Sequence, residues 1–298
     1  MRTAVGILLV AMLVGCGPSD RPASNASGSP EPTVPTLSPI QLPPKGPPSG
    51  KLFADLRQSS RDAALGRMEV WLGNDTAYDV TPTRISYTDP RFRQPLPGER
   101  LRTDPTRSER GYPLTLPARP ACGADRDSTG RLTVEHDGKR VELEVTDDND
   151  IVRRYLDSRC LELAVHRVAD LRFADEVPTD GSGEGSTARL VLVVSPTGRA
   201  GHVLRIDSVG GTPLFSAAGS SSWAPRATVR GDDPVRRIEL PVEPARCDDH
   251  VFMESGGATA FLVRLHLDGR PGQLVLRMSP AGASAAIAFA RDSCGLSG

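Results

Sequence analysis

Apolar and polar residues alternate along several short stretches of the chain, which is the pattern of β-strands with one buried face. The clearest case lies between residues 132 and 145, where two alternating stretches flank Asp137-Gly138. This dipeptide readily adopts the positive φ angles of a type I′ turn, so the sequence predicts a two-residue β-hairpin. A second hairpin is predicted around Asp268-Gly269, with a turn lengthened by Pro271 and Gly272.

Other stretches predict further strands and a few short helices. Met68, Val70 and Leu72 share one face of a half-buried strand, whereas 190–194 is apolar throughout and predicts a central strand. Helices are predicted at the capping residues Asp148-Asn149-Asp150 with the apolar face 151–156, at Ser279-Pro280 with 281–290, and more weakly over 52–65. A last strand of the first half is predicted over 161–165.

An internal repeat divides the chain in two. The matches occur in the same order in both halves, and their offset rises from 115 to 134 residues. The matched positions are Ala54–Arg57 with Ala169–Arg172, Arg84-Ile85 with Arg205-Ile206, Leu116–Cys122 with Leu240–Cys247, Asp137-Gly138 with Asp268-Gly269, and Cys160 with Cys294. We predict a mainly β chain with two tandem related antiparallel β-sandwich (Ig-like) domains, 51–166 and 167–298, each with a short helix.

The N-terminus carries a sorting signal. Arg2 precedes an apolar run over 4–14, which is too short to span a bilayer, since a span needs about 20 apolar residues. Leu13-Val14-Gly15-Cys16 resembles a bacterial lipobox. The resemblance implies a signal peptide over 1–15, cleavage before Cys16, and lipidation of Cys16 with diacylglycerol and an acyl chain such as palmitate. The alternative is an ordinary secretory signal that contains a cysteine.

Residues 16–50 then form a predicted tether. Ten prolines fall within 17–50, a composition that resists folding into a core and favours extended polyproline II. At about 3.1 Å per residue the tether spans up to about 100 Å. A proline-recognition segment is the alternative to a spacer.

The four remaining cysteines are predicted to form disulfides, because an exported protein meets an oxidising compartment. Equivalent domains should carry equivalent bridges, which pairs Cys122 with Cys160 and Cys247 with Cys294. A four-cysteine zinc site is the competing hypothesis, and the absence of any Cys-x-x-Cys spacing disfavours it.

Several segments resemble a recurrent exported protein family of actinobacteria. The segments are 56–62, 68–74, Asp89-Pro90-Arg91-Phe92 and 240–250, and the resemblance extends over most of residues 51–294. It implies an exported lipoprotein with a duplicated, cysteine-bridged domain, and no particular activity.

Charge and candidate chemistry add little to this picture. The 36 basic and 37 acidic residues nearly balance, so nucleic acid is not an expected partner. The sequence contains no nucleophile elbow, zinc-binding helix or phosphate loop, so no catalytic residue, metal ligand or cofactor is predicted. Asp147–Asp150 is assigned to helix capping, since it lacks the spacing of a calcium loop.

The remaining candidate residues are weak. Cys247-Asp248-Asp249-His250 could suggest a metal site, but the first half has no matching histidine, so we expect a loop beside a disulfide. His166, His202 and His266 are expected as half-exposed residues in strand-like contexts. Trp71 falls in a strand, where packing is the expectation. Trp223 follows three serines in an expected loop and is the candidate binding aromatic.

Two functional hypotheses follow. The first is a lipid-anchored, non-enzymatic protein on the extracytoplasmic face of the cell membrane. It would bind the bilayer through the acyl chains on Cys16 and would bind an envelope protein or a wall component through its β domains. The second is a hydrolase or small-ligand-binding protein with its site in a cleft between the domains.

Overall fold

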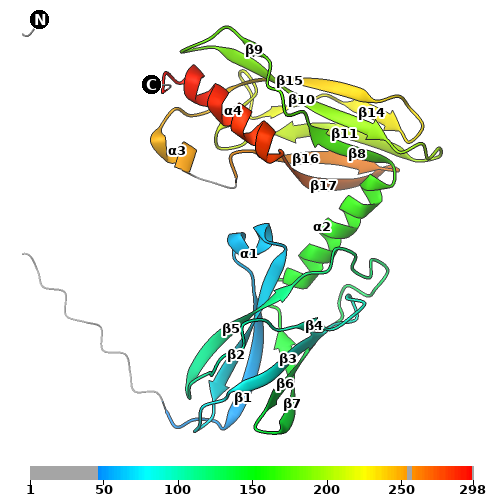
Figure 1. Cartoon of the computed structure of the whole chain (residues 1–298). Helices are drawn as coiled ribbons and strands as arrows, with labels where there is room; N and C mark the ends of the chain where they lie inside the picture. The colour runs from blue at the N-terminus through cyan, green and yellow to red at the C-terminus, as the bar shows by residue number, and fades with distance from the viewer. Residues whose placement is uncertain (1–45, 254–256, 297–298) are drawn as a thin grey trace, which may run out of the picture. The chain divides into compact units, whose positions relative to one another are not determined.

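The computed structural model describes residues 46–253 and 257–296, which are mainly β (Figure 1). We call residues 46–166 the N-terminal half and the other described residues the C-terminal half. The N-terminal half contains β1 (Lys51–Arg57), α1 (Ser60–Ala64), β2 (Arg67–Asp75), β3 (Pro82–Thr88), β4 (Leu96–Pro97), β5 (Ser108–Thr115), β6 (Arg131–His136), β7 (Lys139–Thr146) and α2 (Ile151–His166).

The C-terminal half contains twelve further elements. They are β8 (Ala169–Phe173), β9 (Thr179–Asp180), β10 (Thr187–Pro196), β11 (Val203–Gly210), β12 (Phe215–Ser216), β13 (Ser222–Trp223), β14 (Ala227–Arg230), β15 (Arg236–Pro244), α3 (Asp249–Met253), β16 (Ala260–Leu267), β17 (Arg270–Arg277) and α4 (Pro280–Ser293). Among the described residues, no helix has the length and apolar character that a membrane span requires. The predicted signal peptide and Cys16 lie outside the described residues.

The strands of the N-terminal half form one sheet in the order β4-β3-β6-β7-β1-β2-β5. Neighbouring strands are antiparallel except β1 and β7, which pair in parallel at Ala54 with Val145 and at Asp55 with Thr146. The prediction of purely antiparallel pairing is wrong at this seam. β1 and β7 are the first and last strands of the half, so no tight turn joins them and forces them to run in opposite directions.

The pairings of the N-terminal half recur in the C-terminal half. The set β1-β2-β5 corresponds to β8-β10-β15, and β3-β6-β7 corresponds to β11-β16-β17, with every pair antiparallel. The register recurs as well, since Ile85 lies opposite Val134 and Ile206 lies opposite Leu265. The offsets across these two pairs, 206 − 85 = 121 and 265 − 134 = 131, fall within the series found in the sequence. The sequence repeat is therefore also a repeat of strand pairing.

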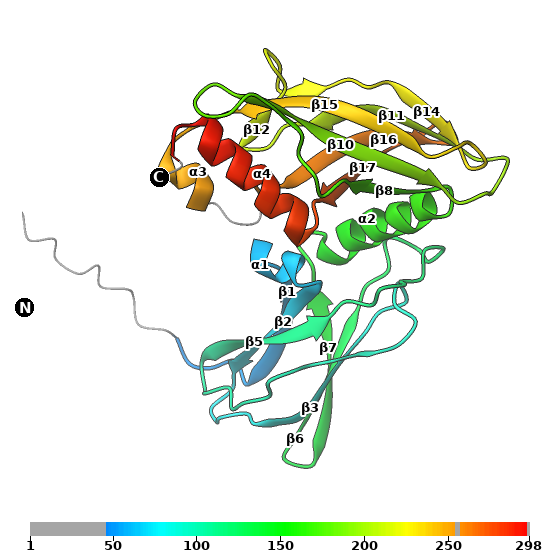
Figure 2. The same cartoon turned by 45° about the horizontal axis from the view of Figure 1, so that its top comes forward.

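The halves differ where their first and last strands meet. By the same offsets, Ala169 of β8 and Leu276 of β17 correspond to the paired Ala54 and Val145, but β8 and β17 belong to separate sheets. Helix α2 contacts both strands there (Figure 2). Side chains from all three elements line a cavity of about 110 Å³. The first and last long strands, β1 and β7, are thus hydrogen-bonded in the N-terminal half, whereas their counterparts β8 and β17 belong to different sheets.

Both predicted hairpins are confirmed. Asp137 and Gly138 join β6 to β7 with φ angles of 47° and 69°, and Asp268 and Gly269 join β16 to β17 with φ angles of 50° and 81°. The second turn also has two residues, so the predicted lengthening is wrong. Pro271 instead lies inside β17, where it pairs with His266 of β16.

Helix α2 is longer than the sequence predicted. It runs unbroken to His166, so the predicted strand over 161–165 is wrong. Val152 in its first turn belongs to the hydrophobic core of the N-terminal half, and Val165 near its end belongs to the core of the C-terminal half. A run of apolar residues this short fits a strand or a helix equally well, and packing against two cores decides for the helix.

Asp147 caps α2, as the assignment of Asp147–Asp150 to helix capping predicted, although the capping residues were expected at 148–150. Its Oδ1 accepts the backbone N–H of Ile151 at 2.7 Å, and its Oδ2 accepts that of Val152 at 3.0 Å. Asp150 occupies the N-cap position with a φ of 52°, and its side chain makes no capping hydrogen bond.

The other predicted helices differ in outcome. Ser279 caps α4 as predicted, with its hydroxyl accepting the N–H of Gly282 at 3.0 Å. The helix predicted over 52–65 shrinks to α1, because 51–57 is instead strand β1, which pairs with β2. Ser59 and Asp62 close a capping box at the start of α1.

The two predicted disulfides are present. Cys122 bonds to Cys160 in α2, and Cys247 bonds to Cys294 at the end of α4, with Cα–Cα distances of 5.6 and 5.3 Å. Each bridge therefore ties the helix after the hairpin to the loop that precedes the hairpin.

We expect each disulfide to stabilise the fold by about 4 kcal/mol, because it closes a loop of about 40 residues in the unfolded chain. Replacing both Cys122 and Cys160 by alanine should lower the urea midpoint of unfolding, and reducing the wild type should lower it further. Unchanged midpoints in the double variant would contradict the expected contribution.

Candidate ligand-binding site

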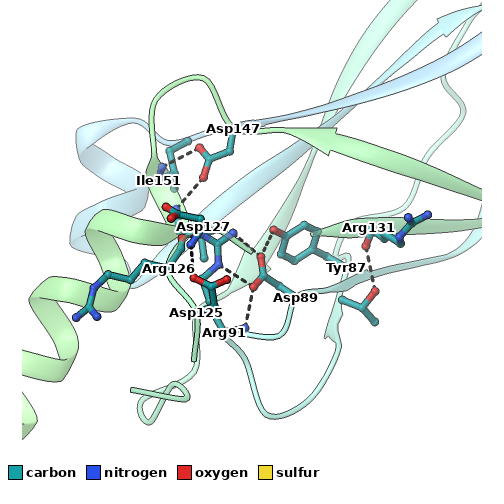
Figure 3. Close-up of polar contacts among 11 residues, drawn as sticks. Tyr87, Asp89, Arg91, Asp125, Arg126, Asp127, Arg131, Asp147 and Ile151 are labelled. Atoms are coloured by element: carbon teal, nitrogen blue, oxygen red, sulfur yellow. Dashed lines mark hydrogen bonds and ion pairs between the residues drawn. The ribbon is translucent and has the colours of Figure 1, made fainter. Parts of the chain in front are cut away.

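Three polar side chains at the end of β3 form a buried cluster of Tyr87, Asp89 and Arg91, called the Asp89 cluster below (Figure 3). Arg91 donates from Nε to Asp89 Oδ1 at 2.8 Å and from Nη2 to Asp89 Oδ2 at 2.7 Å. The Arg91 backbone N–H donates to Oδ1 at 2.8 Å, and the Tyr87 hydroxyl donates to Oδ2 at 2.8 Å. The carboxylate of Asp89 therefore accepts four hydrogen bonds from within the protein.

The cluster is buried. The side chain of Asp89 is 0% exposed and that of Arg91 is 6% exposed. Burial lowers the pKa of Arg91, but the hydrogen bonds and charge of Asp89 outweigh burial and raise it overall. Burial, followed by the charge of Asp89, raises the pKa of Tyr87. A buried ion pair is tolerated only when its groups are fully hydrogen-bonded, and this pair meets that condition.

The cluster ties the loop after β3 to the loop that carries Cys122. Arg91 Nη1 donates to the carbonyl oxygen of Arg126 at 3.1 Å. The backbone N–H of Ala121 donates to the carbonyl oxygen of Arg91 at 2.9 Å. The disulfide then connects this second loop to α2 through Cys160, so the cluster joins three segments that are distant in sequence.

Aromatic packing fixes the same region. The ring of Phe92 lies 6.3 Å from the rings of both Tyr87 and Tyr155, measured between centroids. Glycine at residue 130 leaves room for the Tyr87 hydroxyl, because a β-carbon there would lie 2.1 Å from that oxygen. Any larger residue at 130 would displace the donor to Asp89.

Two cavities flank the Asp89 cluster. One, of about 230 Å³, is lined by charged residues that are largely paired: Arg153 bonds to Asp150, and Arg126 Nε lies 2.6 Å from Asp157 Oδ1. The other, of about 390 Å³, is called the Arg93 groove below. Its side chains include those of Thr88, Phe92, Arg93, Gln94, Thr129 and Arg131.

The histidines singled out in the sequence do not join this site. Each bonds to an aspartate elsewhere: His166 Nδ1 to Asp170 at 2.5 Å, His202 Nδ1 to Asp268 at 2.9 Å, and His266 Nδ1 to Asp207 at 2.6 Å. Only His266 lies in a strand, while His166 ends α2 and His202 precedes β11. Within the described ranges no serine, threonine or cysteine hydrogen-bonds these imidazoles, so the hydrolase hypothesis gains no nucleophile–base pair.

The two tryptophans occupy different surroundings. Trp223 lies in β13 rather than a loop and is 7% exposed, with Nε1 donating to the Pro241 carbonyl at 2.5 Å. The expected exposed aromatic is therefore part of the C-terminal core, where Phe261 packs 6.2 Å away. Trp71 lies in β2 as predicted, and the Arg57 guanidinium covers its ring at 4.2 Å.

The segment 247–250 does not gather metal ligands. Cys247 is bonded to Cys294, Asp248 pairs with Arg246 at 2.8 Å, and α3 begins at Asp249. In residues 46–253 and 257–296, no group of three or more His, Cys, Asp or Glu side chains is arranged to hold a metal ion.

Comparisons with known proteins identify no family. No protein-family model and no curated protein sequence matches the chain. Among solved structures, the red sea bream transglutaminase matches at a TM-score of 0.22 and 10% identity, over 76% of this chain and 31% of that one. The CsuC–CsuE chaperone–adhesin complex of Acinetobacter baumannii matches at a TM-score of 0.20 and 10% identity, over 72% of this chain and 92% of that one. The chain thus spans about a third of the length of the transglutaminase.

The Asp89 cluster belongs to the N-terminal half alone. The strand registers place Val209 at the position of Tyr87, since their partners in β16 and β6 are Val263 and Leu132. Counting on from Val209, Gly211 and Pro213 take the places of Asp89 and Arg91. This site was not among the predicted ones, although Tyr-x-Asp-x-Arg at a strand end is a usable signal for a buried ion pair.

We expect Asp89→Ala to destabilise the protein by about 3–5 kcal/mol, because it leaves the Arg91 guanidinium buried without its partner. Tyr87→Phe, which removes one donor, should cost about 1 kcal/mol. Urea unfolding measures both, with the exposed Asp148→Ala as the control. A cost for Asp89→Ala no larger than the control would refute the structural role of the cluster.

A second buried carboxyl lies at Asp104, which is 0% exposed. Its Oδ1 accepts the Ser108 hydroxyl at 2.6 Å, while Oδ2 has no hydrogen-bond partner among the described residues. Burial raises the pKa of Asp104, and the opposing hydrogen bond from Ser108 and charge of Arg110 do not cancel this. The folded protein therefore holds a proton on this group more tightly than the unfolded chain does.

Since the folded pKa of Asp104 is raised, its contribution to stability is full below the unfolded carboxyl pKa of about 4 and is lost as pH rises through the folded pKa. Asp104→Asn mimics the protonated acid, so it should flatten this decline in melting temperature between pH 4 and 8. The exposed Asp232→Asn serves as the control. An unchanged pH slope in Asp104→Asn would contradict the assignment.

Proposed function

We propose that this protein is a lipid-anchored component of the bacterial cell envelope that acts by binding a ligand or partner outside the cytoplasm. In this proposal Cys16 carries the acyl chains, 17–50 is the tether, and the β-rich part holds the binding surface. The observation that carries it is the pair of disulfides at matched places, Cys122–Cys160 and Cys247–Cys294. Disulfides of this kind form and persist in oxidising compartments outside the cytoplasm.

The binding part is proposed to consist of two tandem related β-sandwich domains, 51–166 and 167–298. The recurrence of strand pairings and of one disulfide per half supports this. In the N-terminal half, apolar residues of β1, β2 and β5 share one core with those of β3, β6 and β7. A single core between two sets of strands fits a sheet that folds back on itself.

A binding role is favoured over catalysis by how the polar groups are used. The Asp89 carboxylate accepts four hydrogen bonds from Tyr87 and Arg91, which leaves it unsuited to accept a proton from a substrate. The adjoining Arg93 groove offers guanidinium, amide and hydroxyl donors, which are groups that recognise a ligand. The partner is expected to be an envelope protein or a wall component.

The anchor can be tested by intact-mass measurement of the mature protein from a bacterial host. We expect a chain that begins at Cys16 and carries a diacylglyceryl group and acyl chains, and that fractionates with the membrane. Cys16→Ala should be neither lipidated nor cleaved at this position, and inhibition of lipoprotein signal peptidase should leave 1–15 attached. An unmodified Cys16 in the wild type would refute the lipid anchor.

A further inference from the structure

We propose that the Arg93 groove binds a phosphate group, carried on a ligand with a small apolar or polyol portion. This inference deepens the proposed binding role by naming the chemistry of the ligand. It does not depend on the lipid anchor.

Unused positive charge distinguishes this groove. Arg93 is exposed and makes no hydrogen bond or ion pair with any part of the chain that the structure describes. Among the described residues, the Arg131 guanidinium forms one ion pair, with Glu144, at 3.9 Å between Nη2 and Oε1, and these side chains are 61% and 90% exposed. An ion pair so long and exposed contributes little, so the Arg131 guanidinium is also available.

The groove has no free carboxylate to neutralise these cations. Asp89 is the acidic residue of its lining, and all four of its hydrogen bonds go to Tyr87 and Arg91. Its charge is already matched by that of Arg91 at 2.7 Å. The lining therefore carries one unpaired cation, Arg93, and a second, Arg131, whose only counter-charge is the long, exposed pair with Glu144 outside the groove, and this excess of positive charge favours an anion.

The donor set suits phosphate better than carboxylate. One guanidinium can satisfy both oxygens of a carboxylate in a bidentate pair. The lining includes two arginines, Thr129 and Gln94, and their side-chain donors together outnumber the hydrogen bonds that the two oxygens of a carboxylate can accept. A phosphate group has enough oxygens for both arginines.

The rest of the groove defines the size of the ligand. Its volume of about 390 Å³ falls within the range of about 300–1,000 Å³ that is typical of small-molecule sites. Phe92, Pro90 and Pro95 give it an apolar wall. This wall fits the carbon skeleton of a glycerol phosphate or a sugar phosphate.

The loop that carries Arg93 is held before a ligand arrives. Asp89 and Arg91 fix its start, and Leu96, which pairs with Tyr87 through β4, is buried at its end. Proline rings at 90 and 95 further restrict the backbone between these points. A loop already ordered loses less conformational entropy on binding, which favours affinity.

The C-terminal half does not repeat the residues of the groove. The strand registers place Leu262 at the position of Arg131 and Gly210 at that of Thr88. The phosphate site is thus a feature of one copy of the repeat, and the duplicated fold does not require these arginines.

The test is calorimetric titration of the full-length protein in detergent with sn-glycerol 3-phosphate. We expect binding that weakens as salt rises, and at least a 10-fold loss of affinity in Arg93→Ala and in Arg131→Ala, since a charge-assisted hydrogen bond contributes about 1.5–3 kcal/mol. Arg84→Ala removes an exposed arginine of β3 that does not line the groove, and it should bind as the wild type does.

Three results would overturn the proposal. The first is that glycerol 3-phosphate does not bind at concentrations up to about 10 mM, which is about the weakest affinity worth assigning. The second is that succinate binds with the same affinity as glycerol 3-phosphate. The third is that Arg84→Ala loses as much affinity as Arg93→Ala. Failure here would leave the lipid anchor intact, because mass measurement at Cys16 tests that separately.

The source of the phosphate can be distinguished in nanodiscs. In one outcome, the protein binds added glycerol 3-phosphate in phosphatidylcholine discs but not in phosphatidylglycerol discs. This result would identify an anionic lipid headgroup as the occupant. Equal binding in both discs would identify a soluble or polymeric phosphate. Either result requires that Arg93→Ala weaken the binding at least 10-fold.

Discussion

Helix α2 is the element on which both halves of the structure depend. Val152 at its start is buried in the N-terminal core, Val165 at its end is buried in the C-terminal core, and Cys160 between them bonds to Cys122. Each fully buried aliphatic side chain contributes about 1.5–3 kcal/mol. A 16-residue helix is only marginally stable in water by itself, so its stability comes from these two cores and the disulfide.

Helix α2 packs at the seam where the two halves differ in strand pairing. In the N-terminal half β1 and β7 pair directly through Ala54 and Val145. At the corresponding seam of the C-terminal half, the side chain of Leu161 from α2 lies against Gly272 of β17, where a β-carbon would come within 2.6 Å of a leucine methyl group. The helix thus contributes to the packing at the seam where β8 and β17 do not pair.

Short-range signals in the sequence predicted the structure well, whereas long-range contacts did not. Asp137-Gly138 specifies its turn through its own backbone preferences, and the matched cysteines specify their bridges once the repeat is recognised. Residues 161–165 are helical because they pack against the core of the C-terminal half, and no local sequence pattern reveals that contact. Trp223 was expected in a loop for the same reason, since its burial depends on Phe261, which lies far along the chain.

The Asp89 cluster shows why a buried ion pair can persist where an apolar core would serve stability as well. Replacing such a pair with apolar residues is often neutral or stabilising, so stability alone does not explain its presence. The C-terminal half folds with Val209, Gly211 and Pro213 at these positions, which shows that the repeat does not need the charges. What the pair adds is direction: bonded to Asp89, Arg91 fixes the backbone from which Arg93, two residues on, extends to solvent. Arg91, which is buried and paired with Asp89, thus positions the backbone of Arg93, which is exposed and unpaired among the described residues.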